Sequence, residues 1–166
     1  MAAFATSYIK TEGTALTRQA DVASMTGTNF SSWFRADEGT MFGEGAGLST
    51  AGIRLFSIGQ SSANVMYVAG TQSTVVAAGA TQASFAYSPT AGVSYKQALA
   101  YKTNDFAAAR DAVLATDAVG QIPTGVTQAN IGSIEAGGTF TGSGHIRKVA
   151  YYPARLSGAQ LQALTR

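Results

Sequence analysis

The sequence predicts an all-β domain, either a sandwich or a barrel. Strand-length apolar segments recur along the chain, and the segments between them are rich in Gly, Ser, Thr, Asn and Pro, the residues of turns. Only 12% of the 166 residues are charged, so salt-bridged helices are difficult to build from this composition. A hydrophobic fraction of 46% argues against disorder. We therefore expect one domain over residues 1–166, with residues 1–5 as a flexible or linker end.

Alternation of apolar and polar residues identifies the clearest strands. Phe85 and Tyr87 fall on one face of segment 83–88, and Tyr95 and Leu99 fall on one face of a later strand, so both strands are expected to bury one side only. The predicted strands are 39–45, 53–59, 64–70, 73–79, 83–88, 94–102, 109–116, 129–134 and 145–152.

Three segments depart from simple alternation. Segments 53–59 and 145–152 alternate poorly, as do strands that are covered on both faces or carry a bulge. Segment 104–116 is rich in alanine and has fair helix propensity, but its large apolar residues form no helical stripe. We interpret it as strand, turn and strand.

The chain closes on a short helix, predicted from about residue 158 to about residue 164. Ser157 occupies the N-cap position and Gln160 follows three residues later, which is the spacing of a capping box. Leu156 before the cap and Leu161 in the helix form a hydrophobic staple. Since a helix of under two turns is not stable alone in water, its leucines must dock on the sheets.

Bulk properties exclude several classes of function. The chain has no cysteine, which excludes disulfides and thiolate metal sites. Its net charge of +2 comes from scattered residues, so we expect no nucleic-acid partner. The first ten residues lack the pattern of a Sec signal, and no window is apolar enough for a membrane span.

Catalytic patterns are weak. His145 is the only histidine, and we interpret it as a structural residue at the start of a strand and not as a general base. The GEGAGLS segment (43–49) lacks the spacing and setting of a dinucleotide-binding loop. A glycosidase needs two carboxyl groups that face each other. Two sets of acidic residues are close in sequence, but nothing else in the sequence supports a catalytic pair in either. These sets are Asp37, Glu38 and Glu44, and Asp105, Asp111 and Asp117.

The binding candidates are aromatic residues and loop oxygens. Trp33 is the only tryptophan, and its ring either packs in the core or serves as a platform for a sugar; Tyr87 is a second possible stacking surface. Asn104 and Asp105 are candidate polar ligands on a loop. Asp105, Asp111 and Asp117 are candidates for calcium, the alternative being acids that hydrogen-bond within turns. No other cofactor is expected.

Four segments together resemble the concanavalin A-like (laminin-G-like) jelly-roll domains of bacteriophage tail-fibre, tail-spike and head-fibre proteins. They are residues 6–34 with the Trp-containing strand, EGTMF (38–42), YKQALAYKTNDFAAA (95–109) and GHIRKVAYYPARLSGAQLQALT (144–165). The resemblance covers nearly the whole chain. Three features differ. The opening reads YIKT (8–11) where those domains usually have proline, and the hairpin reads ARDAV where they often carry glycine. The E-x-D-x-(x)-E signature of glucanases with this fold is also missing.

The resemblance implies a two-sheet antiparallel jelly-roll sandwich with a short C-terminal helix. It implies a protein of the virion surface, made in the bacterial cytoplasm and often trimeric, with other virion proteins as partners. The expected function is non-catalytic binding of host-surface polysaccharide during attachment. The alternatives are a structural module that decorates or trimerises a capsid or tail without binding sugar, and a capsule depolymerase, which needs two facing carboxyl groups.

Overall fold

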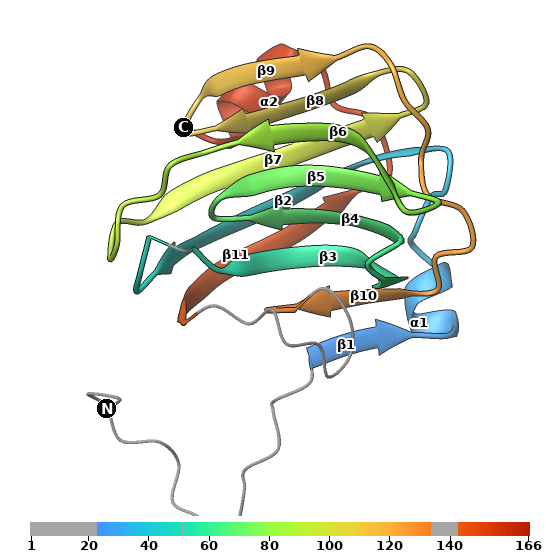
Figure 1. The fold of residues 1–166 in the computed structure, drawn as a ribbon, viewed down its shortest axis with the longest axis horizontal. Helices are drawn as coiled ribbons and strands as arrows, with labels where there is room; N and C mark the ends of the chain where they lie inside the picture. The colour runs from blue at the N-terminus through green and yellow to red at the C-terminus, as the bar shows by residue number, and fades with distance from the viewer. Residues whose placement is uncertain (1–22, 51, 134–142) are drawn as a thin grey trace, which may run out of the picture.

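A computed structural model describes residues 23–50, 52–133 and 143–166 as two antiparallel β-sheets packed face to face (Figure 1). The described strands form one sheet in the order β1-β10-β3-β4-β5-β6 and a second in the order β11-β2-β7-β8-β9. The strands of the first sheet are β1 (Ala23–Thr26), β3 (Arg54–Ser61), β4 (Asn64–Ala69), β5 (Gln72–Ala77), β6 (Ala80–Ala86) and β10 (Gln128–Ile131). Those of the second are β2 (Glu38–Gly47), β7 (Tyr95–Lys102), β8 (Phe106–Arg110), β9 (Val113–Asp117) and β11 (Gly144–Tyr152).

Each predicted strand segment overlaps an observed strand, and segment 104–116 is the predicted strand, turn and strand, β8 and β9. Two elements were not predicted: β1, whose four residues are all exposed, and the short helix α1 (Thr28–Ser31). Neither has a clear sequence signal, because the alternation of β1 is only four residues long and α1 has no side-chain cap.

The core lies between the sheets. Met41, Leu99 and Ala108 are neighbours across β2, β7 and β8, and all three are fully buried. The expected irregularity of two strands is confirmed, because the pairings of β3 and β11 both contain register shifts. In β3 the shift spans Leu55, so Leu55 and Phe56 both join the core although they are adjacent in sequence.

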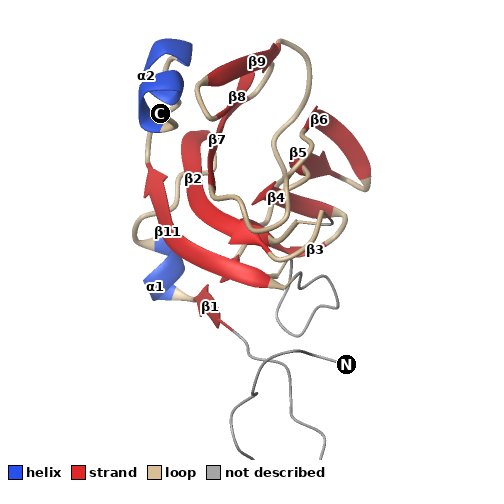
Figure 2. Ribbon diagram, turned by 90° about the vertical axis from the view of Figure 1, so that its left-hand side faces the viewer, coloured by secondary structure: helices blue, strands red, loops and turns tan. Residues whose placement is uncertain are grey.

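A second apolar layer covers the outer face of the five-stranded sheet. Phe42, Ala98 and Ala109 are register partners on this face, and Leu161 of helix α2 (Gly158–Leu164) packs against them. Figure 2 shows α2 lying alongside the five-stranded sheet. The prediction that β7 buries only one side is therefore wrong: Ala98 and Ala100 are fully buried beneath α2.

The predicted helix is confirmed at Gly158–Leu164, with its capping box. The Ser157 backbone N–H donates to Gln160 Oε1 at 2.8 Å, and Gln160 N–H donates back to the Ser157 hydroxyl. Leu156 packs in the same cluster as Leu161, as the hydrophobic staple requires. Among the described residues, no helix has the length and apolar character needed to cross a membrane.

Candidate functional site

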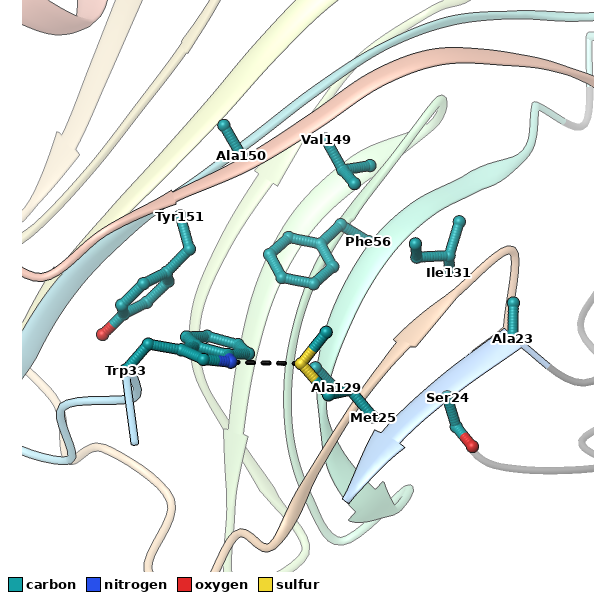
Figure 3. Close-up of a pocket in the computed structure, with 10 residues that line it drawn as sticks. All are labelled: Ala23, Ser24, Met25, Trp33, Phe56, Ala129, Ile131, Val149, Ala150 and Tyr151. Carbon is teal, nitrogen blue, oxygen red and sulfur yellow. Dashed lines mark hydrogen bonds between the residues drawn. The ribbon is translucent and has the colours of Figure 1, made fainter. Parts of the chain in front are cut away.

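A cavity of about 300 Å³ opens between the two sheets, at the side where β1 and β11 form their edges (Figure 3). Its lining is almost entirely apolar, and two aromatic rings stand at one end, Trp33 from the turn after α1 and Tyr151 from β11. The lining residues are Ala23, Ser24, Met25, Trp33, Phe56, Ala129, Ile131, Val149, Ala150 and Tyr151.

The segment after α1 fixes the ring of Trp33. Phe30 is buried and anchors α1, and the Trp33 ring meets it edge-on with centroids 5.1 Å apart. Trp33 Nε1–H donates to the carbonyl oxygen of Asn29 at 2.7 Å and lies 3.1 Å from Met25 Sδ. Because the indole N–H is satisfied within the protein, the ring offers apolar surface to the cavity.

Tyr151 connects the cavity to the core. Its ring lies 4.8 Å from that of Trp33, centroid to centroid. Its hydroxyl accepts from the Arg35 backbone N–H at 3.0 Å and lies 2.9 Å from the hydroxyl of Tyr101, which donates to the Arg35 carbonyl oxygen at 2.7 Å. Burial raises the pKa of both tyrosines. A Cβ at Gly39 would lie 2.6 Å from each hydroxyl oxygen, so the arrangement needs glycine there.

A second hollow, of about 510 Å³, lies against the same two rings. Its lining is more polar, because Arg35 takes part. Arg35 Nε–H donates to Asp37 Oδ1 at 3.0 Å; this hydrogen bond is the main reason that the pKa of Arg35 is raised and that of Asp37 lowered. The lining residues are Ser32, Trp33, Phe34, Arg35, Tyr151 and Pro153. Aromatic surface beside an exposed charged pair can contact both the C–H face and the hydroxyl groups of a sugar.

The structure separates the predicted site residues. Trp33 lies at the two hollows, whereas Tyr87 packs against the core beside Arg110, whose guanidinium carbon is 5.4 Å from its ring centre. Burial raises the pKa of Tyr87 to about 12. Asn104 Oδ1 accepts from Gly120 N–H at 3.0 Å, and Asp105 pairs with Arg155 at 2.6 Å. Asn104 and Asp105 therefore bond to two other segments of the chain, the one after β9 and the one between β11 and α2.

The acidic candidates do not converge on one point. Asp105 precedes β8 and Asp111 follows it, so they lie at opposite ends of the strand. Asp117 lies near the Asp105 end, and its Oδ1 accepts from Val119 N–H, a contact within a turn. Across the part of the chain that the structure describes, no three acidic or histidine side chains are grouped as a metal would require. The calcium set is thus not brought together.

The other acidic set is also dispersed. Asp37, Glu38 and Glu44 each have a cation of their own, respectively Arg35, Lys102 and Arg147. Glu44 shares a charged cleft of about 290 Å³ with Lys96, Asp111 and Arg166, beside the C-terminal end of α2. His145 lies exposed in β11.

Sequence reasoning missed Tyr151, Phe34 and Arg35 as partners of Trp33. Tyr151 and Tyr152 are adjacent in β11, so they point to opposite faces. Which of the two faces inward depends on the pairing of β11 with β2, in which Tyr151 is opposite the buried Met41. The sequence shows the two adjacent tyrosines, but it does not show which of them faces inward.

No protein-family model and no curated protein matches the sequence. Solved structures do match. The CBM40 carbohydrate-binding module of the Ruminococcus gnavus IT-sialidase, bound to α2,3-sialyllactose, is 17% identical with a TM-score of 0.63; the match covers 90% of this chain and 96% of that one. A NanB structure with Optactamide has 11% identity and a TM-score of 0.67, over 86% of this chain and 26% of the other. A Limulus polyphemus pentraxin has 17% identity and a TM-score of 0.55, over 76% and 69%.

These likenesses establish the fold. The neighbours are jelly-roll, concanavalin A-like domains, so the predicted fold class is confirmed. The chain spans about a quarter of the NanB chain but nearly all of the CBM40 module. The link to phage fibres stays a prediction.

Proposed function

We propose that this chain is a non-catalytic carbohydrate-binding module whose site is the pair of hollows at Trp33 and Tyr151. The observation that carries the proposal is an aromatic-lined, solvent-open surface beside the exposed Arg35–Asp37 pair. It is supported by the likeness over nearly full length to a module bound to sialyllactose. The dispersed, individually paired carboxylates Asp37, Glu38 and Glu44 favour binding over hydrolysis.

We further propose that this module belongs to a virion fibre or spike and recognises host-surface polysaccharide during attachment. The basis is the sequence resemblance over residues 6–34, 38–42, 95–109 and 144–165. A trimer would raise avidity without new contacts, since tethered sites act at high effective concentration. Sedimentation of the full chain tests this assembly: a monomer at micromolar concentration would contradict the trimer.

The binding test is a glycan array that includes bacterial surface polysaccharides and sialyllactose, followed by calorimetry with the best ligand. Arg35→Ala should weaken binding about tenfold or more by removing charge-assisted hydrogen bonds. It should leave stability nearly unchanged, because the Arg35 side chain is exposed and its partner Asp37 is exposed as well.

Arg147→Ala is the matched control, since Arg147 is also an exposed arginine with one acidic partner, Glu44, but lies outside both hollows. Loss of binding in Arg147→Ala with normal binding in Arg35→Ala would move the site to the charged cleft. If no glycan binds the assembled protein, the rival role, a decoration or trimerisation module, is favoured. Met25 and Ile131 are the exposed apolar residues that such a contact would use.

A further inference from the structure

The two hollows meet at the same pair of rings but differ in chemistry. The cavity between the sheets is apolar, and the second hollow, which Trp33 and Tyr151 also line, contains Arg35. We infer that they form one composite site for a glycan bearing a short apolar substituent, such as an acyl or alkyl group. The sugar lies in the Arg35 hollow and the substituent enters the cavity. This inference rests on the proposed function and specifies its ligand.

The register of the strands makes the cavity apolar. Ala23 is opposite Ile131 and Met25 is opposite Ala129 in the β1–β10 pair, so all four side chains share one face. Ile131 is in turn opposite Phe56 of β3, which belongs to the core. The cavity is therefore a continuation of the sandwich core toward the β1 and β11 edges (Figure 3).

The described residues leave this continuation open, where a core is normally filled. Met25 and Ile131 remain 44% and 41% exposed at the cavity, whereas the core partner Phe56 is 6% exposed. A volume of about 300 Å³ is at the lower end of the range of small-molecule sites. Water gains few hydrogen bonds in such a lining, so an apolar group that displaces it gains affinity.

The shared rings determine how the ligand is oriented. Trp33 Nε1–H is already bonded to Asn29, so the ring contributes contact surface to both compartments. Polar contacts for hydroxyl groups come from the Arg35 side, where Arg35 and Asp37 are exposed. A simple sugar would fill only the Arg35 hollow, and a simple alkyl chain only the cavity. A sugar that carries an apolar group matches both.

Fluorescence of Trp33 gives a direct test, because Trp33 is the only tryptophan and borders both compartments. The full chain is titrated with 1-hexanol, with methyl glucoside and methyl galactoside, and with the hexyl forms of the same two sugars below their micellar concentrations. Transfer of a methylene from water is worth up to about fourfold in affinity. We expect saturable binding of 1-hexanol, and at least about tenfold tighter binding of a hexyl glycoside than of its methyl form.

Two variants locate the effect. Ala23→Phe fills the cavity from the exposed edge strand β1, and should abolish 1-hexanol binding while leaving methyl glycoside binding intact. Ile131→Thr keeps a β-branched shape but makes the lining polar, and should reduce the hexyl preference severalfold. Val113→Thr is the matched control, an exposed β-strand valine outside both hollows, and should change nothing.

Each remaining outcome decides the question. Equal affinity for hexyl and methyl glycosides, or a hexyl preference that survives in Ala23→Phe, overturns the composite site. Glycan binding without 1-hexanol binding overturns it and leaves the proposed function intact. Binding of 1-hexanol without any glycan on the array overturns the proposed function. A change of Trp33 emission with protein concentration alone, lost in Ala23→Phe, would show instead that a second copy of this chain occupies the cavity.

Discussion

The outer face of the five-stranded sheet and the opening between β1 and β11 are both apolar, but among the residues that the structure describes only the first is covered by another element. Leu161 of α2 closes the outer face and is fully buried. At the opening, Met25 and Ile131 remain exposed and a cavity of about 300 Å³ persists. The covered surface contributes stability, and the opening is the surface that we propose for a ligand.

The largest expected difference between the two regions concerns packing. Leu161→Ala should lower the free energy of unfolding by about 2–5 kcal/mol, because it leaves a void beneath α2. Ile131→Ala at the opening should cost only about 1 kcal/mol, because its side chain is already partly in water. Urea denaturation measures both. Equal losses would mean that the opening is as well packed as the covered face.

The tyrosine pair beside the opening is the next test. Tyr101→Phe removes the hydroxyl that bonds Arg35 and Tyr151, and should cost about 1–2 kcal/mol. Tyr152→Phe is the control, because Tyr152 follows Tyr151 in β11 and points to the opposite face of the sheet. Urea denaturation compares the two variants. A loss in the control as large as that in Tyr101→Phe would refute the role assigned to the hydroxyl network.

These tyrosines also predict a dependence on pH. Burial raises the pKa of Tyr101 in the folded state, and raises that of Tyr87 to about 12, above the unfolded value of about 10. The folded state thus holds more protons than the unfolded state above pH 10. The stabilisation is complete below about pH 10 and should decline as pH rises, for Tyr87 between about 10 and 12. Urea titrations should show a shallower decline in Tyr87→Phe and Tyr101→Phe.

The cap of α2 should have a smaller effect. Ser157→Ala removes the hydroxyl that accepts from Gln160 N–H and should cost about 1 kcal/mol. Combining it with Gln160→Ala should cost less than the sum of the two, because the residues form one capping box. Thermal unfolding measures the loss. An unchanged melting temperature in Ser157→Ala would contradict this account of the helix.

The smallest effect should be a gain. The turn between β8 and β9 places Asp111 at φ 46° and Ala112 at φ 65°, a region where a side chain is strained. Ala112→Gly should relieve that strain, although glycine loses more chain entropy on folding than alanine does. The net effect should be a stabilisation of about 0.5–1 kcal/mol. Ala115→Gly in β9 is the control and should destabilise. A lower melting temperature for Ala112→Gly would show that the turn is not strained.

Local patterns in the sequence were sufficient for much of the fold. Gly, Asn and Ser turns separate the strands, and the alternation of Phe85 with small residues marks a half-buried strand, because side chains of a strand alternate between faces. Ser157 and Gln160 defined α2 to the residue, because capping is a contact between residues three apart. The jelly roll itself followed from resemblance and not from these patterns.

The sequence alone thus determined the fold class, the final helix and Trp33 as a candidate. Tertiary structure decided which surfaces are covered. Ala98 and Ala100 are buried because α2 returns over them, and Trp33 meets Tyr151 because β11 pairs with β2 in a particular register. Both facts depend on contacts between residues far apart in the chain, which periodicity within one segment does not encode. The cavity between β1 and β11 also depends on contacts between distant residues, because its position is determined by the edges of the two sheets.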